Sequence, residues 1–395
     1  MNILHFASDS IFLDGVVSVW NKVADCKNRY IIVENPSIRK CGFKYVHQGC
    51  VEILSLYEVK KILYDNVKLY DIVILHNLYV LPFAVIKTIP SDKSVVWFSW
   101  GFDIYENAYP AKPLIKVDHL LGVKTSKLNF EIQKKLRNKF RNILLKLYAR
   151  LWKFESYTKF KSAIHRIDYY SGVIPAEYDA LCKCEFFRAE KLIYNYISVP
   201  SVFEEEEIFT YKKEETAKDI LVGNSGSYTN NHLEIFEFLS KCDLKDRRII
   251  SPLSYGDRHY IKEIVAGGYN FFGNNFVPLK NFMPICEYKQ YLSSCSIAIY
   301  AHERQQALGN IYLSLWEGRK VYLSARSLVF NYLKELGLKL YSIQDELNER
   351  SLDEKLSYEE IINNRKIIAM NFSLQAVIKK SEMILSKITN SKILK

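Results

Sequence analysis

The sequence predicts an α/β protein of two doubly wound domains, each with a parallel sheet, facing each other across a cleft. Its 395 residues are enough for two such domains. Strand-like runs alternate with helical segments, and the same rhythm restarts after a charged stretch near residue 200. The polar and glycine-rich motifs follow strand-like runs directly, which is where ligands bind in open α/β sheets.

The first domain is predicted over residues 1–198. Apolar runs bounded by polar or turn residues mark its strands, and helical segments lie between several of them. These runs lie at 3–6, 30–33, 72–75, 95–99 and 168–170.

Residues 199–218 are the predicted linker, because they carry the run Glu204–Glu207 and the charged tetrapeptide at 212–215. An exposed loop would have the same composition. The second domain is predicted over 219–375, with strand-like runs at 220–222, 248–251, 270–272 and 296–300. A last helix, at about 357–390, closes the chain, and its final part, 376–395, can pack back on the N-terminal domain.

The most specific stretch lies between the runs at 296–300 and 320–324, where a Gly-Asn turn opens an apolar helix. This βαβ unit directs free backbone N–H groups and the positive end of a helix dipole at the crevice. Side chains suited to a diphosphate precede and open the helix: Arg304, Gln305, Gln306, Gly309 and Asn310.

Two further turns follow strands of the second domain. The turn Gly223, Asn224, Ser225, Gly226 would let the backbone approach a phosphate or sugar closely. An ordinary βα loop would look the same. In the second turn, Ser254 precedes Tyr255, whose ring could stack on a base or simply pack.

In the first domain, Asp103 lies in an aromatic sequence after a strand, so it is a candidate base or an acceptor for a sugar hydroxyl. An aspartate that caps the next helix is the alternative. Asp9 and His76 also end strands, and such ends meet at one edge of a sheet. His76 alone would more often be structural.

Residues 124–161 carry most of the net charge of +11, with twelve Lys and Arg against two Glu. Their apolar residues recur every three or four positions, as in an amphipathic helix. This pattern is typical of a membrane-surface helix, and a core-packed helix with a solvated basic face is the alternative. The predicted membrane-binding residues are Lys134, Lys135, Arg137, Arg141, Lys146 and Arg150.

Other classes lack a sequence signal. We find no metal-binding motif, no Walker lysine, no signal peptide and no apolar run of about 20 residues. Cys182 and Cys184 are too closely spaced for a zinc pair, so we expect free thiols. No nucleic-acid-binding motif accompanies the basic stretch.

Taken together, these motifs resemble the Fuc4NAc transferases, glycosyltransferase family 56. The resemblance rests on Trp100–Glu106, Ile220–Gly226, Asn231-His232 and the block from Arg304 to Gly309, with Asp9 and His76 also matching. These enzymes move 4-acetamido-4,6-dideoxygalactose from its dTDP donor to a polyprenyl-diphosphate-linked glycan of surface-polysaccharide synthesis.

The resemblance implies a GT-B fold, two Rossmann-like domains, with no metal or other cofactor. The donor would contact the residues named in the second domain, and the acceptor would face Asp103, Asp9 and His76. It also implies a cytoplasmic enzyme, peripheral on the inner membrane. The alternatives are a GT-B enzyme with a UDP- or GDP-sugar donor, or a non-catalytic scaffold that tethers an assembly complex to the membrane.

Overall fold

The computed structural model describes residues 1–35, 38, 42–105, 113–136, 156–196, 202–211 and 216–393. The chain divides into two compact units. Unit 1 comprises Met1–Lys116, Ile143–Glu204 and Asn371–Lys395, and unit 2 comprises Val117–Asn142 and Glu205–Met370. The crossing at Glu204 lies inside the stretch predicted as a linker.

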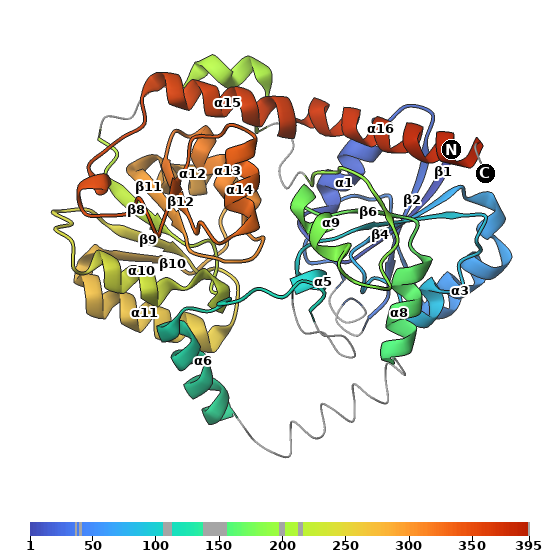
Figure 1. Ribbon diagram of the computed structural model, residues 1–395, viewed down its shortest axis with the longest axis horizontal. Helices are drawn as coiled ribbons and strands as arrows, with labels where there is room; N and C mark the ends of the chain where they lie inside the picture. Colours follow the sequence, from blue (N-terminus) through green and yellow to red (C-terminus); the bar gives the residue numbers. More distant parts are fainter. Residues whose placement is uncertain are drawn as a thin grey trace. The chain divides into compact units, whose positions relative to one another are not determined.

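Unit 1 contains one parallel sheet in the order β3-β2-β1-β4-β5-β6-β7 (Figure 1). Strands β4 and β5 are buried along their whole length, as expected when helices cover both faces. The strands are β1 Asn2–Ala7, β2 Lys27–Val33, β3 Val51–Leu54, β4 Ile72–His76, β5 Ser94–Phe98, β6 Tyr169–Ser171 and β7 Glu190–Lys191.

The helices of unit 1 include one from the far end of the chain. Helix α16 contributes Val377, Ile384 and Ile388 to the same hydrophobic core as α1 and β1. The helices are α1 Leu13–Trp20, α3 Leu56–Asp65, α4 Phe83–Ile86, α5 Phe102–Tyr105, α8 Tyr157–Arg166, α9 Pro175–Leu181 and α16 Leu374–Ile393.

Unit 2 repeats the arrangement with the order β10-β9-β8-β11-β12-β13, again with every pair parallel. Both sheets therefore follow the Rossmann order, in which the order of the strands reverses beside the first strand. The strands are β8 Asp219–Val222, β9 Ile249–Pro252, β10 Phe276–Leu279, β11 Cys295–Tyr300, β12 Lys320–Leu323 and β13 Tyr341–Ser342.

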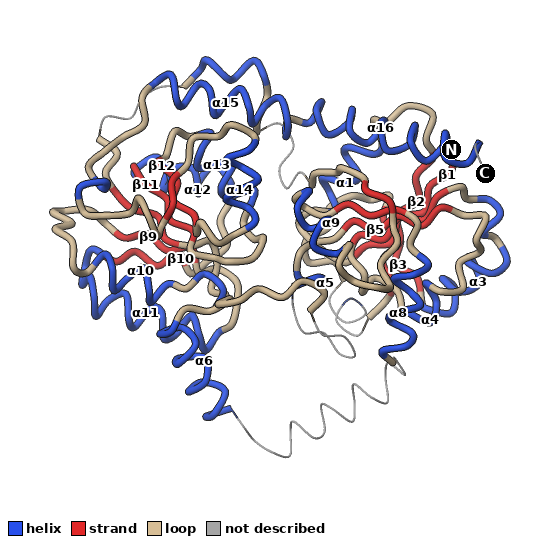
Figure 2. The backbone as a smooth tube through the Cα atoms, in the orientation of Figure 1, coloured by secondary structure: helices blue, strands red, loops and turns tan. Residues whose placement is uncertain are grey.

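Helices cover both faces of the second sheet, with α10 and α11 on one face and α12, α13 and α14 on the other (Figures 1 and 2). The predicted βαβ unit is confirmed as β11, α13 and β12, and Gly318 ends its helix at a φ of +76°. The helices are α6 Val123–Leu136, α10 His232–Leu239, α11 Arg258–Phe272, α12 Ile285–Ser294, α13 Leu308–Trp316, α14 Leu328–Glu335 and α15 Tyr358–Phe372.

The strand predicted at 270–272 is wrong, because these residues are the last turn of α11. The helix begins at Asp257, whose carboxylate accepts hydrogen bonds from the N–H groups of His259 and Tyr260, both at 2.9 Å. Its apolar face packs on α10, where Phe272 meets Phe236 edge to face. The aromatic residues favoured a strand locally, but packing of the whole helix decides the outcome.

Two predicted long helices are also divided. The segment predicted at 124–161 contains α6, which belongs to unit 2, and the start of α8, which belongs to unit 1. Residues 137–155 between them lie outside the described part. The closing helix is split at Ser373, whose side chain accepts from the N–H of Ala376 and starts α16.

The return of α16 predicts that the C-terminal helix stabilises unit 1. Ile388 is 1% exposed in its core, so Ile388→Ala should lower the free energy of unfolding of unit 1 by about 2–5 kcal/mol. Urea unfolding followed by tryptophan fluorescence measures the change. On the same helix, Met383 is 63% exposed and Met383→Ala serves as the control. Equal stability of the two variants would contradict the packing described.

Candidate functional site

The carboxyl edge of the unit 2 sheet begins with a glycine that no other residue can easily replace. Gly223 follows β8 with a φ of +74°, in the left-handed region. A Cβ at this position would lie 2.6 Å from Nε2 of His232 and 3.1 Å from Oδ1 of Asn230. The predicted close approach of backbone at this turn is therefore present, and the neighbours that enforce it come from the start of α10.

Asn224 joins the loops that follow three different strands. Its Oδ1 accepts a hydrogen bond from Nε2 of Gln306 at 3.0 Å, and its Nδ2 donates to the Tyr255 hydroxyl at 2.9 Å. Gln306 in turn accepts from the hydroxyl of Thr229 at 2.5 Å. The predicted donor-binding residues after β8, β9 and β11 thus lie side by side.

The loops after β8 and β9 also approach backbone to backbone. The N–H of Gly226 donates to the carbonyl of Tyr255 at 2.7 Å, and the N–H of Asp257 donates to the carbonyl of Gly226 at 3.0 Å. A Cβ on Gly256 would lie 2.3 Å from the carbonyl carbon of Gly226, so no side chain fits there. Ser225 is buried behind this contact, whereas Ser254 is half-buried and Tyr255 is 55% exposed.

The loop after β11 leads into α13 through Ala307, which has a φ of +60° and caps the helix without a side-chain hydrogen bond. The first-turn N–H groups of a helix have no partner within the helix, so they can bind an anion. Gly309 in this turn is exposed, and Arg304 and Asn310 are half-buried. Gln305, in contrast, is buried.

Two buried residues of this loop, His302 and Glu303, were not among the predicted site residues. Burial, with a smaller contribution from Arg304, lowers the pKa of His302 to about 3, so the imidazole is neutral. Glu303 forms an ion pair with Arg326 at 2.6 Å and accepts from the hydroxyl of Ser324 at 3.0 Å. Their position directly after a strand was the available signal.

The three residues predicted to face the acceptor lie at the carboxyl edge of the unit 1 sheet, but each has its own internal partners. The carboxylate of Asp9 accepts hydrogen bonds from the backbone N–H groups of Lys44, Tyr45 and Val46 at 2.7–3.2 Å. Asp9 therefore anchors a loop. His76 is fully buried and contacts another histidine, His5, at 3.0 Å.

Asp103 holds together the ends of β4 and β5. Its carboxylate accepts from the N–H of Leu78 at 3.0 Å, from Nε1 of Trp97 at 2.8 Å and from the N–H of Trp100 at 2.9 Å. Burial outweighs these bonds and raises the pKa of Asp103 to about 6. Both carboxylate oxygens already accept hydrogen bonds, so Asp103 is suited to positioning Trp100. These contacts resemble those of a helix-capping aspartate more than those of a catalytic base.

The ends of β1 and β4 are linked through Asn77. Its Nδ2 donates to the hydroxyl of Ser8 at 3.2 Å, and its φ is +86°. Asn77 follows β4 and Ser8 follows β1, so this bond spans the point where the strand order reverses. Neither residue was among the sequence predictions for the site.

Helix α6 holds most of the described part of the basic segment, and it packs on unit 2 instead of on the N-terminal domain (Figure 1). Thr125 explains this placement, because its N–H and hydroxyl both donate to the carboxylate of Glu234 in α10 at 2.9 and 2.6 Å. Lys134 and Lys135 are exposed. Arg137, Arg141, Lys146 and Arg150 lie outside the described residues. Within the described ranges, no helix has the length and apolar composition needed to cross a bilayer.

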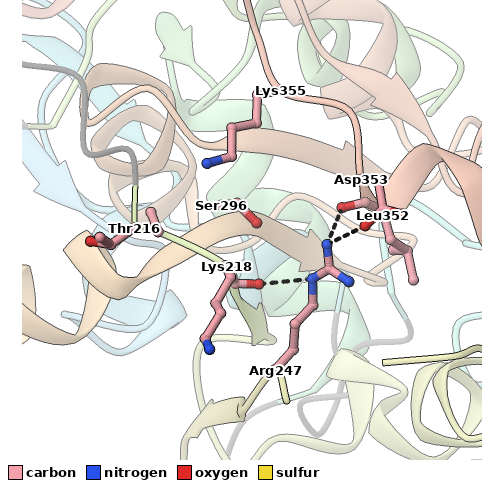
Figure 3. A pocket seen from close by; sticks show the side chains of 8 residues that line it. Thr216, Lys218, Arg247, Ser296, Leu352, Asp353 and Lys355 are labelled. Atoms are coloured by element: carbon pink, nitrogen blue, oxygen red, sulfur yellow. Dashed lines mark hydrogen bonds and ion pairs between the residues drawn. The ribbon is translucent and has the colours of Figure 1, made fainter. Parts of the chain in front are cut away.

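A cavity of about 530 Å³ lies at the opposite, amino edge of the unit 2 sheet (Figure 3). Arg247 lines the cavity and donates hydrogen bonds to the carbonyls of Lys218 and Leu352 and to the carboxylate of Asp353. These bonds tie the start of β8 to the chain after β13. The cavity contains none of the predicted donor-binding residues, and its arginine is committed to holding the fold.

Gly223 provides a test of the loop geometry. We expect Gly223→Ala to destabilise unit 2 by about 1–3 kcal/mol, because the new methyl group meets His232 and the backbone has a positive φ. Gly267→Ala is the control, since Gly267 lies within α11 and its Cβ would only reach Leu233 at 3.4 Å. Thermal unfolding compares them, and an equal effect of the two substitutions would contradict the close approach at Gly223.

Comparison with known proteins agrees with this architecture. HepE of Anabaena, solved with UDP and glucose, has a TM-score of 0.60 at 11% identity, over 98% of this chain and 100% of that one. A glycosyltransferase from Rickettsia africae has a TM-score of 0.60 at 13% identity, over 98% of each chain. These likenesses show the fold, which is GT-B.

A family model described as 4-alpha-L-fucosyltransferase, glycosyl transferase group 56, matches residues 183–385, just over half of the chain. The match includes the predicted donor-binding residues, from Gly223 to Asn310. The chain therefore belongs to glycosyltransferase group 56 and is a glycosyltransferase with the GT-B fold.

Proposed function

We propose that this enzyme transfers a deoxyamino sugar of the Fuc4NAc type from a dTDP-linked donor to a polyprenyl-diphosphate-linked oligosaccharide. The observation that carries the donor half is the convergence of three strand-end loops of unit 2 through Asn224, Tyr255 and Gln306. They meet beside β8 and β11, where the strand order reverses and nucleotides bind in doubly wound sheets.

The diphosphate is best accommodated at the start of α13. As the bond from the anomeric carbon to the diphosphate breaks, its electron pair leaves with the nucleotide, and negative charge grows on the phosphate oxygens. Arg304 and the N–H groups from Leu308 to Asn310 are fixed donors near that charge, and such preorganised donors stabilise a transition state. Exposed Gly309 leaves the backbone open to the ligand.

The nucleoside and sugar would contact the loops after β8 and β9. Tyr255 is exposed enough to stack on the base, while its hydroxyl is held by Asn224 at 2.9 Å. Gly223, Ser225, Gly226 and Ser254 shape the backbone around it. UDP bound to HepE favours a second candidate, a UDP-sugar donor, for the same loops.

The acceptor half of the proposal uses the carboxyl edge of unit 1. Asp103 positions the loop that carries Trp100, and Asp9 anchors residues 44–46. Because three N–H donors occupy the carboxylate of Asp103, we assign it a positioning role there. Asp103→Asn should thus act through the placement of Trp100, and not through the loss of a base.

Membrane association is proposed through α6. Thr125 and Ile132 face unit 2, while Val123 and Phe130 on the outward face are 87% and 66% exposed. Lysines flank these apolar side chains. An outward face of exposed apolar residues with basic neighbours suits an anionic membrane surface, where a lipid-linked acceptor would lie.

Nucleotide binding tests the donor. A ligand stabilises the folded state more strongly the more tightly it binds. Because dTDP is the nucleotide of the proposed donor, we expect it to raise the melting temperature of unit 2 more than UDP or GDP does at equal concentration. Arg304→Ala should weaken dTDP binding about 10- to 100-fold, as the loss of a charged hydrogen bond does. Isothermal titration measures the dissociation constants.

The control is Arg350→Ala, which removes an exposed arginine elsewhere in unit 2. A larger shift with UDP would replace the first candidate by the second. If no nucleotide stabilises the wild type, the proposed donor site on unit 2 is wrong. If Arg304→Ala binds dTDP as the wild type does, Arg304 is not a diphosphate ligand.

Vesicle flotation tests α6. Each cation near an anionic membrane contributes about 1 kcal/mol, so replacing Lys127, Lys134 and Lys135 by Gln should weaken binding about 100-fold. The vesicles contain phosphatidylethanolamine and phosphatidylglycerol. The control triple variant replaces Lys241, Lys262 and Lys280, which are exposed elsewhere on unit 2. Flotation equal to that of the control would exclude α6 as the anchor.

A further inference from the structure

A chain of hydrogen bonds crosses the core of unit 1 and ends at the carboxyl edge of its sheet. Nδ2 of Asn28 donates to the carbonyl of Trp20 at 2.9 Å, and Oδ1 of Asn28 lies 3.1 Å from Nε2 of His5. Nδ1 of His5 lies 3.0 Å from Nε2 of His76, and Nδ1 of His76 lies 3.0 Å from the hydroxyl of Tyr196. Both imidazoles are completely buried.

The chain has one direction, which the carbonyl of Trp20 sets because it can only accept. The amide nitrogen of Asn28 must face that carbonyl, so its oxygen faces His5, which must carry its proton on Nε2. Both imidazoles are neutral, since burial lowers the pKa of His5 to about 3 and that of His76 well below 6.5. A neutral ring has one N–H, so Nδ1 of His5 accepts.

The direction of the next two hydrogen bonds follows from the proton on His5. Since Nδ1 of His5 accepts, Nε2 of His76 must be the donor between the two rings. Nδ1 of His76 then has no proton, and the hydroxyl of Tyr196 must donate to it. The single proton of that hydroxyl is used inward, so its oxygen can only accept further hydrogen bonds, and the indole N–H of Trp100 is one donor within its reach.

Tyr196 is half-buried beside two other half-buried rings. Its ring centroid lies 5.6 Å from that of Trp100, with the planes perpendicular, and 6.0 Å from that of Phe12. Phe12 follows β1 and Trp100 follows β5, on either side of β4, whose last residue is His76. The hydroxyl thus lies where the strand order of unit 1 reverses, among aromatic rings that suit the apolar face of a sugar.

We propose that Tyr196 determines acceptor specificity by accepting a hydrogen bond from a hydroxyl of a neutral saccharide that rests on Trp100 and Phe12. His76, His5 and Asn28 are positioning residues that fix the polarity of the tyrosine. A phosphate or carboxylate oxygen at this point would meet another acceptor, so the charged part of a lipid-linked acceptor must bind elsewhere. The proposal rests on the proposed function, which assigns the acceptor to unit 1.

The first experiment tests the polarity without any ligand. In protein labelled with ¹⁵N-histidine, long-range proton–nitrogen correlation spectra should show His5 and His76 as neutral rings protonated on Nε2 at neutral pH. Their signals are assigned from the variants His5→Gln and His76→Gln. A proton on Nδ1 of either ring would overturn the inference.

The second experiment tests binding with N,N′-diacetylchitobiose as a neutral saccharide probe. Saturation-transfer NMR on the full chain should detect binding to the wild type. Tyr196→Phe should raise the dissociation constant about 3- to 10-fold, as expected for the loss of one neutral hydrogen bond. The matched control is Tyr194→Phe, because Tyr194 neighbours Tyr196 in the chain but is only 2% exposed, so its hydroxyl is out of reach of a saccharide.

The stabilisation of each variant by dTDP, UDP and GDP separates the two proposals. Unchanged nucleotide binding with weaker chitobiose binding in Tyr196→Phe supports the inference. The inference is overturned if Tyr196→Phe and the wild type bind chitobiose equally, or if the wild type does not bind it. The donor proposal still stands in either case when nucleotide binding is unchanged. If no nucleotide stabilises the wild type but the tyrosine effect persists, the proposed donor fails and the saccharide site remains.

Discussion

In both units the strand order reverses beside the first strand, between β1 and β4 in unit 1 and between β8 and β11 in unit 2. The connections on the two sides of the reversal run to opposite faces of the sheet, so the loops at this point diverge and leave polar backbone at the edge. Buried backbone groups need partners, and here side chains from neighbouring loops supply them. In unit 2 the side-chain oxygen of Asn230 accepts from the N–H of Asn224, and in unit 1 Asn77 and Asp103 accept from the N–H groups of Tyr79 and Leu78. The position of each candidate site follows from this constraint.

The same topology presents opposite chemistry in the two units. In unit 2 the edge carries hydrogen-bond donors: Arg304, the start of α13 and loops that only glycine allows to approach so closely. In unit 1 the edge carries aromatic rings and a tyrosine oxygen that can only accept. Donors suit a diphosphate, whereas rings and an acceptor suit a saccharide hydroxyl. This difference fits the proposal that unit 2 binds the sugar nucleotide and unit 1 binds the acceptor saccharide.

Both units contain buried, neutral histidines whose hydrogen bonds order the residues around them. Their pKa values are lowered by burial, so each ring offers one donor and one acceptor with a defined direction. In unit 2, Nδ1 of His232 lies 3.1 Å from the hydroxyl of Tyr260, and its other nitrogen lies beneath Gly223. In unit 1 the pair His5–His76 transmits polarity from a backbone carbonyl to Tyr196. Neither arrangement is suited to a base that must hold a proton at neutral pH.

The sequence alone determined the elements whose signal is local. Apolar runs marked β1, β4, β5, β8 and β11, the turn before an apolar helix marked α13, and their alternation implied parallel sheets with binding residues at the strand ends. Tertiary structure decided whatever depends on contacts between distant residues. The pairing of Asn224 with Gln306 and of His5 with His76 joins residues 82 and 71 positions apart, which no periodicity encodes. Asp103, a candidate base by its sequence context, has its oxygens occupied by donors from two strand ends. Helix α6 joined unit 2 through Thr125 and Glu234, and residues 270–272 became helical, because burial against a partner outweighs local propensity.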